Sequence, residues 1–449
     1  MVEEENLSNM KYAKFFELAK EAGIQEAELY IHKDYSLRFS IFHGEVDNYS
    51  ANNGFSVQAR GLFNGKFGTA SCDVWNLEKA KYLVNEIVTN AKVSENDDPV
   101  FIFEGSKKYK KVSMFNKDLA NVPVENKIQK MLELEKEIKA YDKRIVEVSY
   151  LQYFEMSGET ILFNTKGLKL TTKNNFFYYV GGAVAKQGEQ AKSGYEIFVD
   201  NDFAKFDAKE LAKKVGENTV SQLGGEPCES NTYKAVLSPD VVSSLMEFYV
   251  GSADAEEVQK KSSFFIGKLN EKVASSKVTI EDRPLDKTLF ARGFDDEGVA
   301  TYNKPIIKNG KLQTYLYNLT TAAKDGVATT GNASRGGGKM HISPFYLVFK
   351  PGKKSQEELF KEVGNGVYIT EVTGLHAGMN PQSGNFSLQS TGFLIKDGKK
   401  DRALDIITVS GNLMDVFKDI IEVGNDSKQF TSGSSAPSVI IKKIAVSGK

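Results

Sequence analysis

Cysteine and histidine are scarce in this chain, which has two cysteines and four histidines among its 449 residues. Cys72 and Cys228 are too few for a disulfide framework, so we expect a protein of a reducing compartment, the cytoplasm. No two of these six side chains lie at the sequence spacing of a zinc-ligand motif. The sequence therefore predicts no metal site in this chain.

Long apolar runs and an excess of one charge are also missing. No run of about 18 apolar residues is present that could span a bilayer, and the acidic segment 1–6 lacks the apolar core of a signal peptide. The net charge is −1, from 58 basic and 59 acidic residues. We therefore expect no membrane partner and no direct binding to nucleic acid.

The chain does contain helical and strand patterns in an order typical of an α+β fold. We expect an N-terminal domain of helices and antiparallel sheet, composed of two similar helix–strand–helix units at 1–93 and 118–225. A mostly antiparallel β domain with a few helices is expected at 226–449. Gly-Gly-Glu-Pro at 224–227 marks the boundary, because neither a helix nor a strand passes easily through such a segment.

Local signals predict several turns and element ends. Asn53-Gly54 and Asn64-Gly65 are typical of tight hairpin turns. Ser238-Pro239 predicts the start of a helix, with serine as the cap and proline in the first turn. The aromatic run Phe-Phe-Tyr-Tyr at 176–179 predicts a strand whose rings pack in a core or an interface rather than bind a ligand.

An acidic motif, Gly-Phe-Asp-Asp-Glu-Gly-Val at 293–299, stands out in the C-terminal half. Its carboxylates, Asp295, Asp296 and Glu297, could bind a hard cation through oxygen. Acids between glycines more often form a turn with a buried charge pair, and we favour that interpretation, with Arg292 or Arg335 as the expected partner. The neighbourhood also lacks obvious further ligands for a metal ion.

These residues and others after them carry a resemblance to the TldD/PmbA family, the "modulator of DNA gyrase" metallopeptidases. The match is close in the C-terminal half and loose in the N-terminal half. Each motif alone is weak evidence, whereas their shared order makes the resemblance specific. The landmarks are Phe-Asp-Asp-Glu-Gly-Val at 294–299, Asn-Gly-Lys-Leu at 309–312, Thr-Gly-Asn-Ala at 330–333, Gly-Asn-Phe-Ser at 384–387, Thr-Gly-Phe at 391–393, Gly-Asn-Leu at 411–413 and Val-Gly-Asn-Asp at 423–426.

The zinc motif of the family's catalytic branch has no counterpart in this chain. The resemblance implies a His-Glu-x-x-x-His motif on the helix after the domain boundary, with two histidines binding zinc and the glutamate as general base. Aligned on Val250-Gly251, the histidine positions hold Glu247 and Ser252, and the glutamate position holds Phe248. The family's downstream cysteine ligand is missing too, since no cysteine follows Cys228. The chain thus resembles the PmbA (TldE-type) subunit, with no catalytic residues of its own.

The resemblance implies a supporting role beside a TldD-type zinc metallopeptidase, in a heterodimer or homodimer. Peptides or peptide-derived products would be the substrates, and zinc would be bound by the partner subunit only. Candidate residues for binding substrate or partner are Asp295, Asp296, Glu297, Asn332 and Arg335. Two alternatives stay open: a stand-alone hydrolase whose site no motif reveals, and a protein-binding modulator of DNA gyrase, as the family's name suggests.

Overall fold

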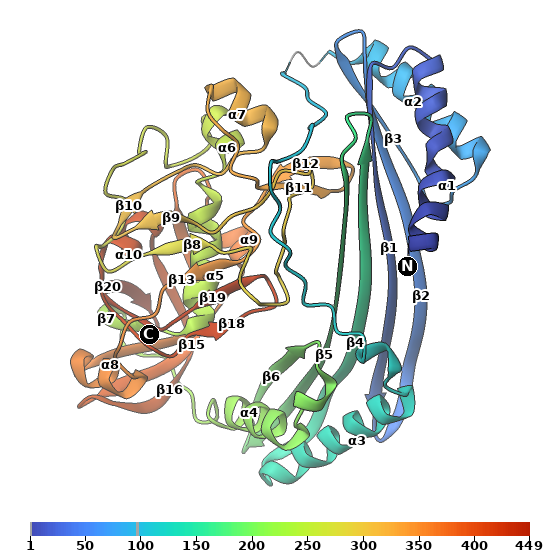
Figure 1. The fold of residues 1–449 in the computed structure, drawn as a ribbon. Coiled ribbons are helices and arrows are strands. Elements are labelled where there is room, and N and C mark those ends of the chain that lie inside the picture. The colour runs from blue at the N-terminus through green and yellow to red at the C-terminus, as the bar shows by residue number, and fades with distance from the viewer. Residues whose placement is uncertain (1, 96–97) are drawn as a thin grey trace.

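The computed structural model describes residues 2–95 and 98–449, with side chains from residue 12 onward. The N-terminal half is built on one long antiparallel sheet of six strands in the order β3-β2-β1-β4-β5-β6 (Figure 1). Its strands are β1 (Glu26–Phe42), β2 (Glu45–Phe63), β3 (Lys66–Cys72), β4 (Ile145–Asn164), β5 (Lys169–Gln187) and β6 (Gln190–Asp200). Because β1 pairs with β4, the two N-terminal units form one continuous sheet.

Two pairs of helices cover one face of this sheet at its two ends. Near one end, α1 (Val2–Glu21) and α2 (Leu77–Val93) pack on a core that includes Leu29 and Ile31. Near the other end, α3 (Val124–Tyr141) and α4 (Ala208–Val220) pack on a core that includes Leu37 and Phe39. All four β1 side chains are at odd positions, so they point to the same face. The sequence predicts Asn9 as the cap of the first helix; this is wrong, because α1 begins at Val2 and includes Asn9.

The opposite face of the sheet is largely free of helices and turns toward the C-terminal domain. The aromatic run at 176–179 divides between the two faces, since alternate strand residues point in opposite directions. Phe177 and Tyr179 are fully buried in the helix-covered core, as predicted. Phe176 and Tyr178 are only half-buried and lie beside Phe154 on the open face, with ring centroids 6.0 and 5.2 Å from that of Phe154.

The two Asn-Gly pairs have different outcomes. Asn64 and Gly65 join β2 to β3 with φ of 49° and 78°, which confirms the hairpin. The hairpin prediction at Asn53-Gly54 is wrong, because both residues lie within β2 and pair with β1. The Asp34 side chain lies over this glycine, since a Cβ at Gly54 would lie 2.3 Å from Oδ1 of Asp34.

The C-terminal domain contains two six-stranded sheets and a short hairpin. One sheet has the order β16-β15-β14-β7-β20-β17, the other has the order β10-β9-β8-β13-β19-β18, and β11 pairs with β12. Most pairs are antiparallel, while β7–β14 and β13–β19 are parallel. The strands of the first sheet are β7 (Asn231–Leu237), β14 (Gly366–Thr373), β15 (Asn385–Lys396), β16 (Lys399–Asn412), β17 (Ile420–Val423) and β20 (Val439–Ser447). The remaining strands are β8 (Ile280–Asp282), β9 (Lys304–Lys308), β10 (Lys311–Leu312), β11 (Ala333–Gly336), β12 (Lys339–Ile342), β13 (Leu347–Phe349), β18 (Lys428–Gln429) and β19 (Ser434–Ala436).

Helix α5 (Pro239–Gly251) is the central helix of this domain. Ser238 caps it as predicted, accepting a hydrogen bond from the Val241 N–H at 3.3 Å. One face of α5, including Met246 and Tyr249, is fully buried, and the Tyr249 ring stacks on Phe417. The other helices are α6 (Ala255–Gln259), α7 (Leu319–Asp325), α8 (Gln356–Val363), α9 (Leu375–Gly378) and α10 (Leu413–Lys418). The whole is a mixed α+β fold, which confirms the predicted class.

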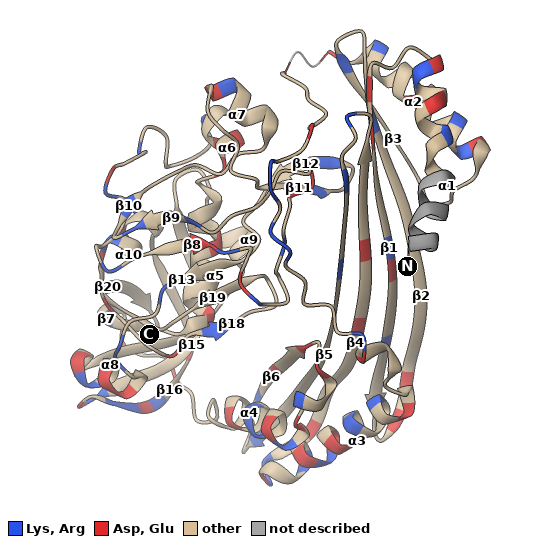
Figure 2. Ribbon diagram, in the orientation of Figure 1, with Lys and Arg blue, Asp and Glu red and all other residues tan. Residues whose placement is uncertain are grey.

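The segment 94–117 connects α2 to the second unit and has neither helix nor strand in its described residues. It runs between the sheet and the C-terminal domain (Figure 1), where Tyr109 donates a hydrogen bond to the Gly298 carbonyl at 2.7 Å. Figure 2 shows basic and acidic residues interspersed along α2, α3 and α4. Within the described residues, no helix has the length and apolar character needed to cross a bilayer.

Candidate functional site

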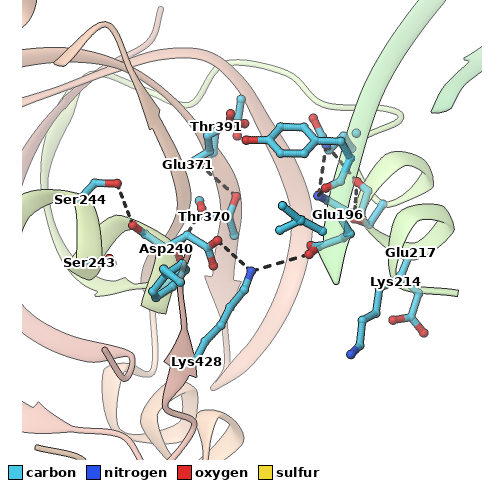
Figure 3. A pocket seen from close by; sticks show the side chains of 18 of the residues that line it. Glu196, Lys214, Glu217, Asp240, Ser243, Ser244, Thr370, Glu371, Thr391 and Lys428 are labelled. Atoms are coloured by element: carbon cyan, nitrogen blue, oxygen red, sulfur yellow. Dashed lines mark hydrogen bonds and ion pairs between the residues drawn. The ribbon is translucent and has the colours of Figure 1, made fainter. Parts of the chain in front are cut away.

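A cleft of about 1040 Å³ separates the end of the long sheet from the C-terminal domain (Figure 3). We call it the main cleft. One wall is formed by β6 and α4, and the other by α5, β14 and β18. Its lining includes Tyr195, Glu196, Ile197, Val199, Lys214 and Asn218 on the first wall, and Asp240, Ser243, Glu247, Thr370, Glu371 and Lys428 on the second.

Lys428 connects the two walls of the main cleft. Its Nζ lies 2.9 Å from Oδ1 of Asp240 and 3.7 Å from Oε2 of Glu196, as Figure 3 shows. Burial alone would lower the pKa of Lys428, but the charges of Glu196 and Asp240 outweigh it and raise that pKa. Partial burial raises the pKa of Glu196, and Lys428 opposes this shift. Partial burial, followed by the charge of Asp240, also raises the pKa of Glu371.

Strand β6 is the open edge of the long sheet and contributes its main chain to the cleft. The Ser193 carbonyl accepts a hydrogen bond from Gln222, just after α4, and the Tyr195 carbonyl accepts one from Asn218 of α4. The main-chain groups of these alternate residues therefore point away from β5. By the same alternation, Ile197 and Val199 direct their main-chain groups away from β5. No partner for these groups is recorded among the residues that the structure describes. An extended chain could therefore add to β6 here.

Glu247 projects from α5 at the border of the main cleft, at the position where the resemblance implies the first zinc-binding histidine. Its Oε1 accepts hydrogen bonds from three serine hydroxyls, those of Ser432 at 2.6 Å, Ser434 at 2.9 Å and Ser243 at 3.4 Å. The carboxylate is thus fixed in orientation by neutral donors. It also lines a second cavity.

This second cavity, which we call the α5 hollow, has a volume of about 360 Å³. It is lined by all three residues at which the resemblance implies the zinc motif: Glu247, Phe248 and Ser252. These side chains do not fit zinc, because Phe248 has no donor atom and Ser252 offers only a neutral hydroxyl. In the described part of the chain, no group of three or more His, Cys, Asp or Glu side chains is arranged to hold a metal ion.

The acidic motif lies elsewhere, at the contact between the C-terminal domain and the long sheet. Asp295 is fully buried and closes its own turn: Oδ1 accepts from the N–H groups of Glu297 and Val299, and Oδ2 accepts from the N–H of Ala333. Asp296 accepts from the hydroxyl of Tyr30 in β1 at 2.7 Å. The expected ion pair of Asp296 is present, with Arg292.

A buried network of charges joins the two domains at this contact. Arg335 pairs with Glu28 of β1, and Glu28 also accepts a hydrogen bond at 2.8 Å from Nε of Arg60. Arg60 lies 3.8 Å from Glu297, whose Oε2 accepts from the Leu319 N–H. We call the set the interdomain charge network; its members are Glu28, Arg60, Arg292, Asp296, Glu297 and Arg335.

Asn332, the remaining candidate, is buried close to this network. Its Nδ2 donates to Oδ2 of Asp282 at 2.8 Å and to the Ser343 carbonyl at 2.9 Å. The five binding candidates therefore lie together, but inside the protein and apart from the main cleft. Their role in binding stays a prediction. The cleft residues Glu196, Asp240 and Lys428 were not predicted, because no short-range pattern links positions so far apart.

Asp295 gives the protein a pH-dependent stability. Burial and the charge of Glu297 raise the pKa of Asp295 to about 7, although three backbone N–H groups oppose the shift. In the unfolded chain this carboxyl titrates at about pH 4. Between these pH values Asp295 is protonated in the folded state and ionised in the unfolded state. The contribution of Asp295 to the free energy of unfolding is therefore complete below about pH 4 and is lost as the pH rises toward 7. We expect the free energy of unfolding, measured by urea titration, to fall over this range.

The variant Asp295→Asn should show a smaller fall between about pH 4.5 and about pH 7.5. Asp401→Asn, at an exposed position of β16, is the matched control and should follow the unmodified protein. Equal slopes for Asp295→Asn and the unmodified protein would contradict this origin of the pH dependence.

The chain is similar to a known protein family over most of its length. Models of three PmbA/TldA metallopeptidase domains match the chain: domain 1 at residues 27–91, the central domain at 117–223 and the C-terminal domain at 230–448. The chain belongs to the PmbA/TldD family. This PmbA/TldD member is 24% identical to a metalloprotease PmbA homolog of Haemophilus influenzae, over 96% of this chain and 94% of the relative. It is 25% identical to the metalloprotease PmbA of Escherichia coli O157:H7, over 94% and 92% of the two chains.

Solved structures of the PmbA/TldD family have the same fold. A Thermotoga maritima protein, named for a suspected role as a modulator of a DNA gyrase, has a TM-score of 0.91 and 33% identity, covering 98% of this chain and 100% of its own. TldE from Thermococcus kodakarensis has a TM-score of 0.89 over 97% of this chain and 100% of its own. At 21% identity, the likeness to TldE shows the fold alone.

Proposed function

We propose that this chain is the non-catalytic partner subunit of a TldD-type zinc metallopeptidase and holds peptide substrates for it. The observation that carries the proposal is the chemistry of α5. Where the resemblance implies two zinc-binding histidines and a general base, this helix presents Glu247, Phe248 and Ser252 to a cavity. A phenylalanine in the place of the base accepts no proton and orients no water.

The main cleft supports the substrate-holding part of the proposal. Residues of both domains line it. At Ile197 and Val199, the edge strand β6 offers to it main-chain groups that are unpaired among the described residues. Addition of a strand uses main-chain hydrogen bonds that any peptide sequence can supply, with selectivity left to the side-chain pockets. The exposed carboxylates of Glu371 and Glu247 would favour basic groups on the peptide.

The interdomain charge network supports the same role in another way. It fixes the long sheet to the C-terminal domain on one side of the molecule, whereas the main cleft on the other side is crossed by Lys428. The zinc-motif subunit would add the catalytic site, and zinc would be bound there alone.

Reconstitution with a zinc-motif family member from the same organism tests the proposal. We expect the purified chain to leave an unstructured peptide intact and the mixture to cleave it at least about tenfold faster than the zinc-motif subunit alone. The triple variant Glu247→Ala/Phe248→Ala/Ser252→Ala tests for a hidden catalytic role: kcat of the reconstituted mixture should stay within about threefold, with any loss of peptide binding confined to KM. Cleavage by this chain alone, or a zinc-motif subunit that is equally active without it, would overturn the proposal.

A further inference from the structure

The α5 hollow has the composition of a small ligand site rather than of a packing defect. Its volume of about 360 Å³ lies within the range of roughly 300–1,000 Å³ that small-molecule pockets occupy. Phe248 and Pro381 give it apolar walls, and Glu247 and Glu257 each bring a carboxylate to it. The hollow therefore combines a low-polarity lining with negative charge.

Both carboxylates are held by hydroxyl groups and not by cations. Glu247 accepts from Ser432 and Ser434, and Oε2 of Glu257 accepts from Ser262 at 2.5 Å. Among the residues that the structure describes, neither carboxylate forms an ion pair with Lys, Arg or His. Glu247 is exposed and Glu257 is partly buried, and two neighbouring carboxylates without a cationic partner attract a positively charged ligand.

A buried hydroxyl provides an independent sign of a ligand. Ser252 lines the hollow but is only 5% exposed, and no hydrogen-bond partner is recorded for its hydroxyl within the described chain. Its main-chain carbonyl is already used, since it accepts from Ser263 at 2.6 Å. Ser252 thus adds a hydroxyl without a protein partner, as far as the chain is described, to the same lining as the two carboxylates.

A primary ammonium group matches this set of neighbours. It carries three N–H donors, which can be shared among the two carboxylates and the Ser252 hydroxyl. The ring of Phe248 can add a cation–π contact at the wall. A Ca²⁺ ion matches less well, because it takes about six to eight oxygen ligands, and the hydroxyls that hold Glu247 and Glu257 occupy part of the coordinating capacity of these carboxylates.

We propose that the α5 hollow binds the primary ammonium group of a peptide, either its amino terminus or a lysine side chain. Glu247 lines both cavities, so a peptide lying along β6 in the main cleft can place this group in the hollow without leaving the protein surface. The inference rests on the proposed function only in taking the ligand to be a peptide. It makes α5 a recognition element at the position where the resemblance implies a zinc site.

Binding of a labelled peptide to this chain alone tests the inference. The probe is a short lysine-free peptide of Ala, Val and Thr with a carboxyl-terminal fluorophore, prepared with a free amino terminus, with an acetylated terminus, and acetylated with one central lysine. We expect at least one ammonium-bearing form to bind about tenfold tighter than the acetylated lysine-free form in fluorescence anisotropy. The form that gains affinity identifies the source of the ammonium group.

Isosteric variants assign the effect to the hollow. Glu257→Gln and Glu247→Gln should each remove most of the tenfold preference, and circular dichroism verifies that the variants fold. Glu256→Gln is the matched control, because Glu256 lies next to Glu257 in α6 but pairs with Lys260 and does not line the hollow. It should keep the preference.

Equal affinity for the three peptides, no binding of any of them, or a preference that survives both Gln variants would overturn the inference. Displacement of the peptide by Ca²⁺ or Zn²⁺ that depends on Glu247 would overturn it as well, since the hollow would then be a metal site. The measurement needs no zinc-motif subunit. A failure to stimulate that subunit would therefore count against the proposed function and leave the peptide-binding result standing.

Discussion

Arg335→Met should destabilise the protein by about 3–5 kcal/mol, the usual cost of removing one partner from a buried ion pair. The Arg335 side chain is 6% exposed, and Glu28, its partner, is fully buried. Its Nε also donates to the Asp296 carbonyl at 3.0 Å. The substitution would leave the acids of the interdomain charge network with Arg60 and Arg292 as their only basic partners in it. Urea unfolding at neutral pH measures the change in free energy.

Arg283→Met is the matched control for Arg335→Met. Arg283 also pairs with two acids, Glu281 and Asp286, but its side chain is 33% exposed. Its loss should cost about 1 kcal/mol or less, as for other solvent-accessible ion pairs. A similar small loss for Arg335→Met would contradict a structural role of the network and would favour its predicted role in binding.

Ile197→Pro should weaken peptide binding in the main cleft strongly. Proline removes the N–H that β6 offers to an added strand, and a peptide carbonyl left without a donor costs about 1–3 kcal/mol, roughly 5- to 150-fold in affinity. Proline is tolerated where the N–H of an edge strand points away from its neighbour, so we expect β6 to stay paired with β5. Fluorescence anisotropy with a labelled unstructured peptide measures the change.

Ile197→Ala separates the main-chain effect from the side-chain effect. It shortens the side chain at the same place and keeps the N–H, so its affinity should stay within about threefold of the unmodified protein. Equal affinities for the proline variant and the unmodified protein, at unchanged thermal stability, would show that peptides do not add to β6. Equal losses in both variants would assign the binding to the Ile197 side chain.

The sequence correctly predicted those turns and helix ends that depend on interactions between neighbouring residues. The cap at Ser238 and the hairpin at Asn64-Gly65 are formed by neighbouring residues, and both are present. Asn53-Gly54 has the same signal but forms no turn, because pairing along the whole length of β1 and β2 outweighs a two-residue preference. Phe176 and Phe177 likewise lie on opposite faces of the sheet, one open and one covered by helices. The sequence alone does not show which face the helices cover.

In the candidate sites, too, contacts between residues close in the sequence were predicted, and contacts between distant residues were not. The pairing of Asp296 with Arg292 spans four positions and was predicted, whereas Glu28 lies 307 positions from Arg335 and was not. The main cleft depends on contacts of this long-range kind, such as that of Glu196 with Lys428. The resemblance singled out Glu247, Phe248 and Ser252 from the sequence, but the cavity that they line is a property of the fold.

Zinc content, measured by elemental analysis, tests the central claim most directly. It should be determined for the purified chain, for a zinc-motif family member from the same organism and for the complex of the two. We predict no stoichiometric zinc in this chain alone and one zinc ion per complex, contributed by the partner, because α5 presents Glu247, Phe248 and Ser252 instead of zinc ligands. Stoichiometric zinc in the isolated chain would contradict the account.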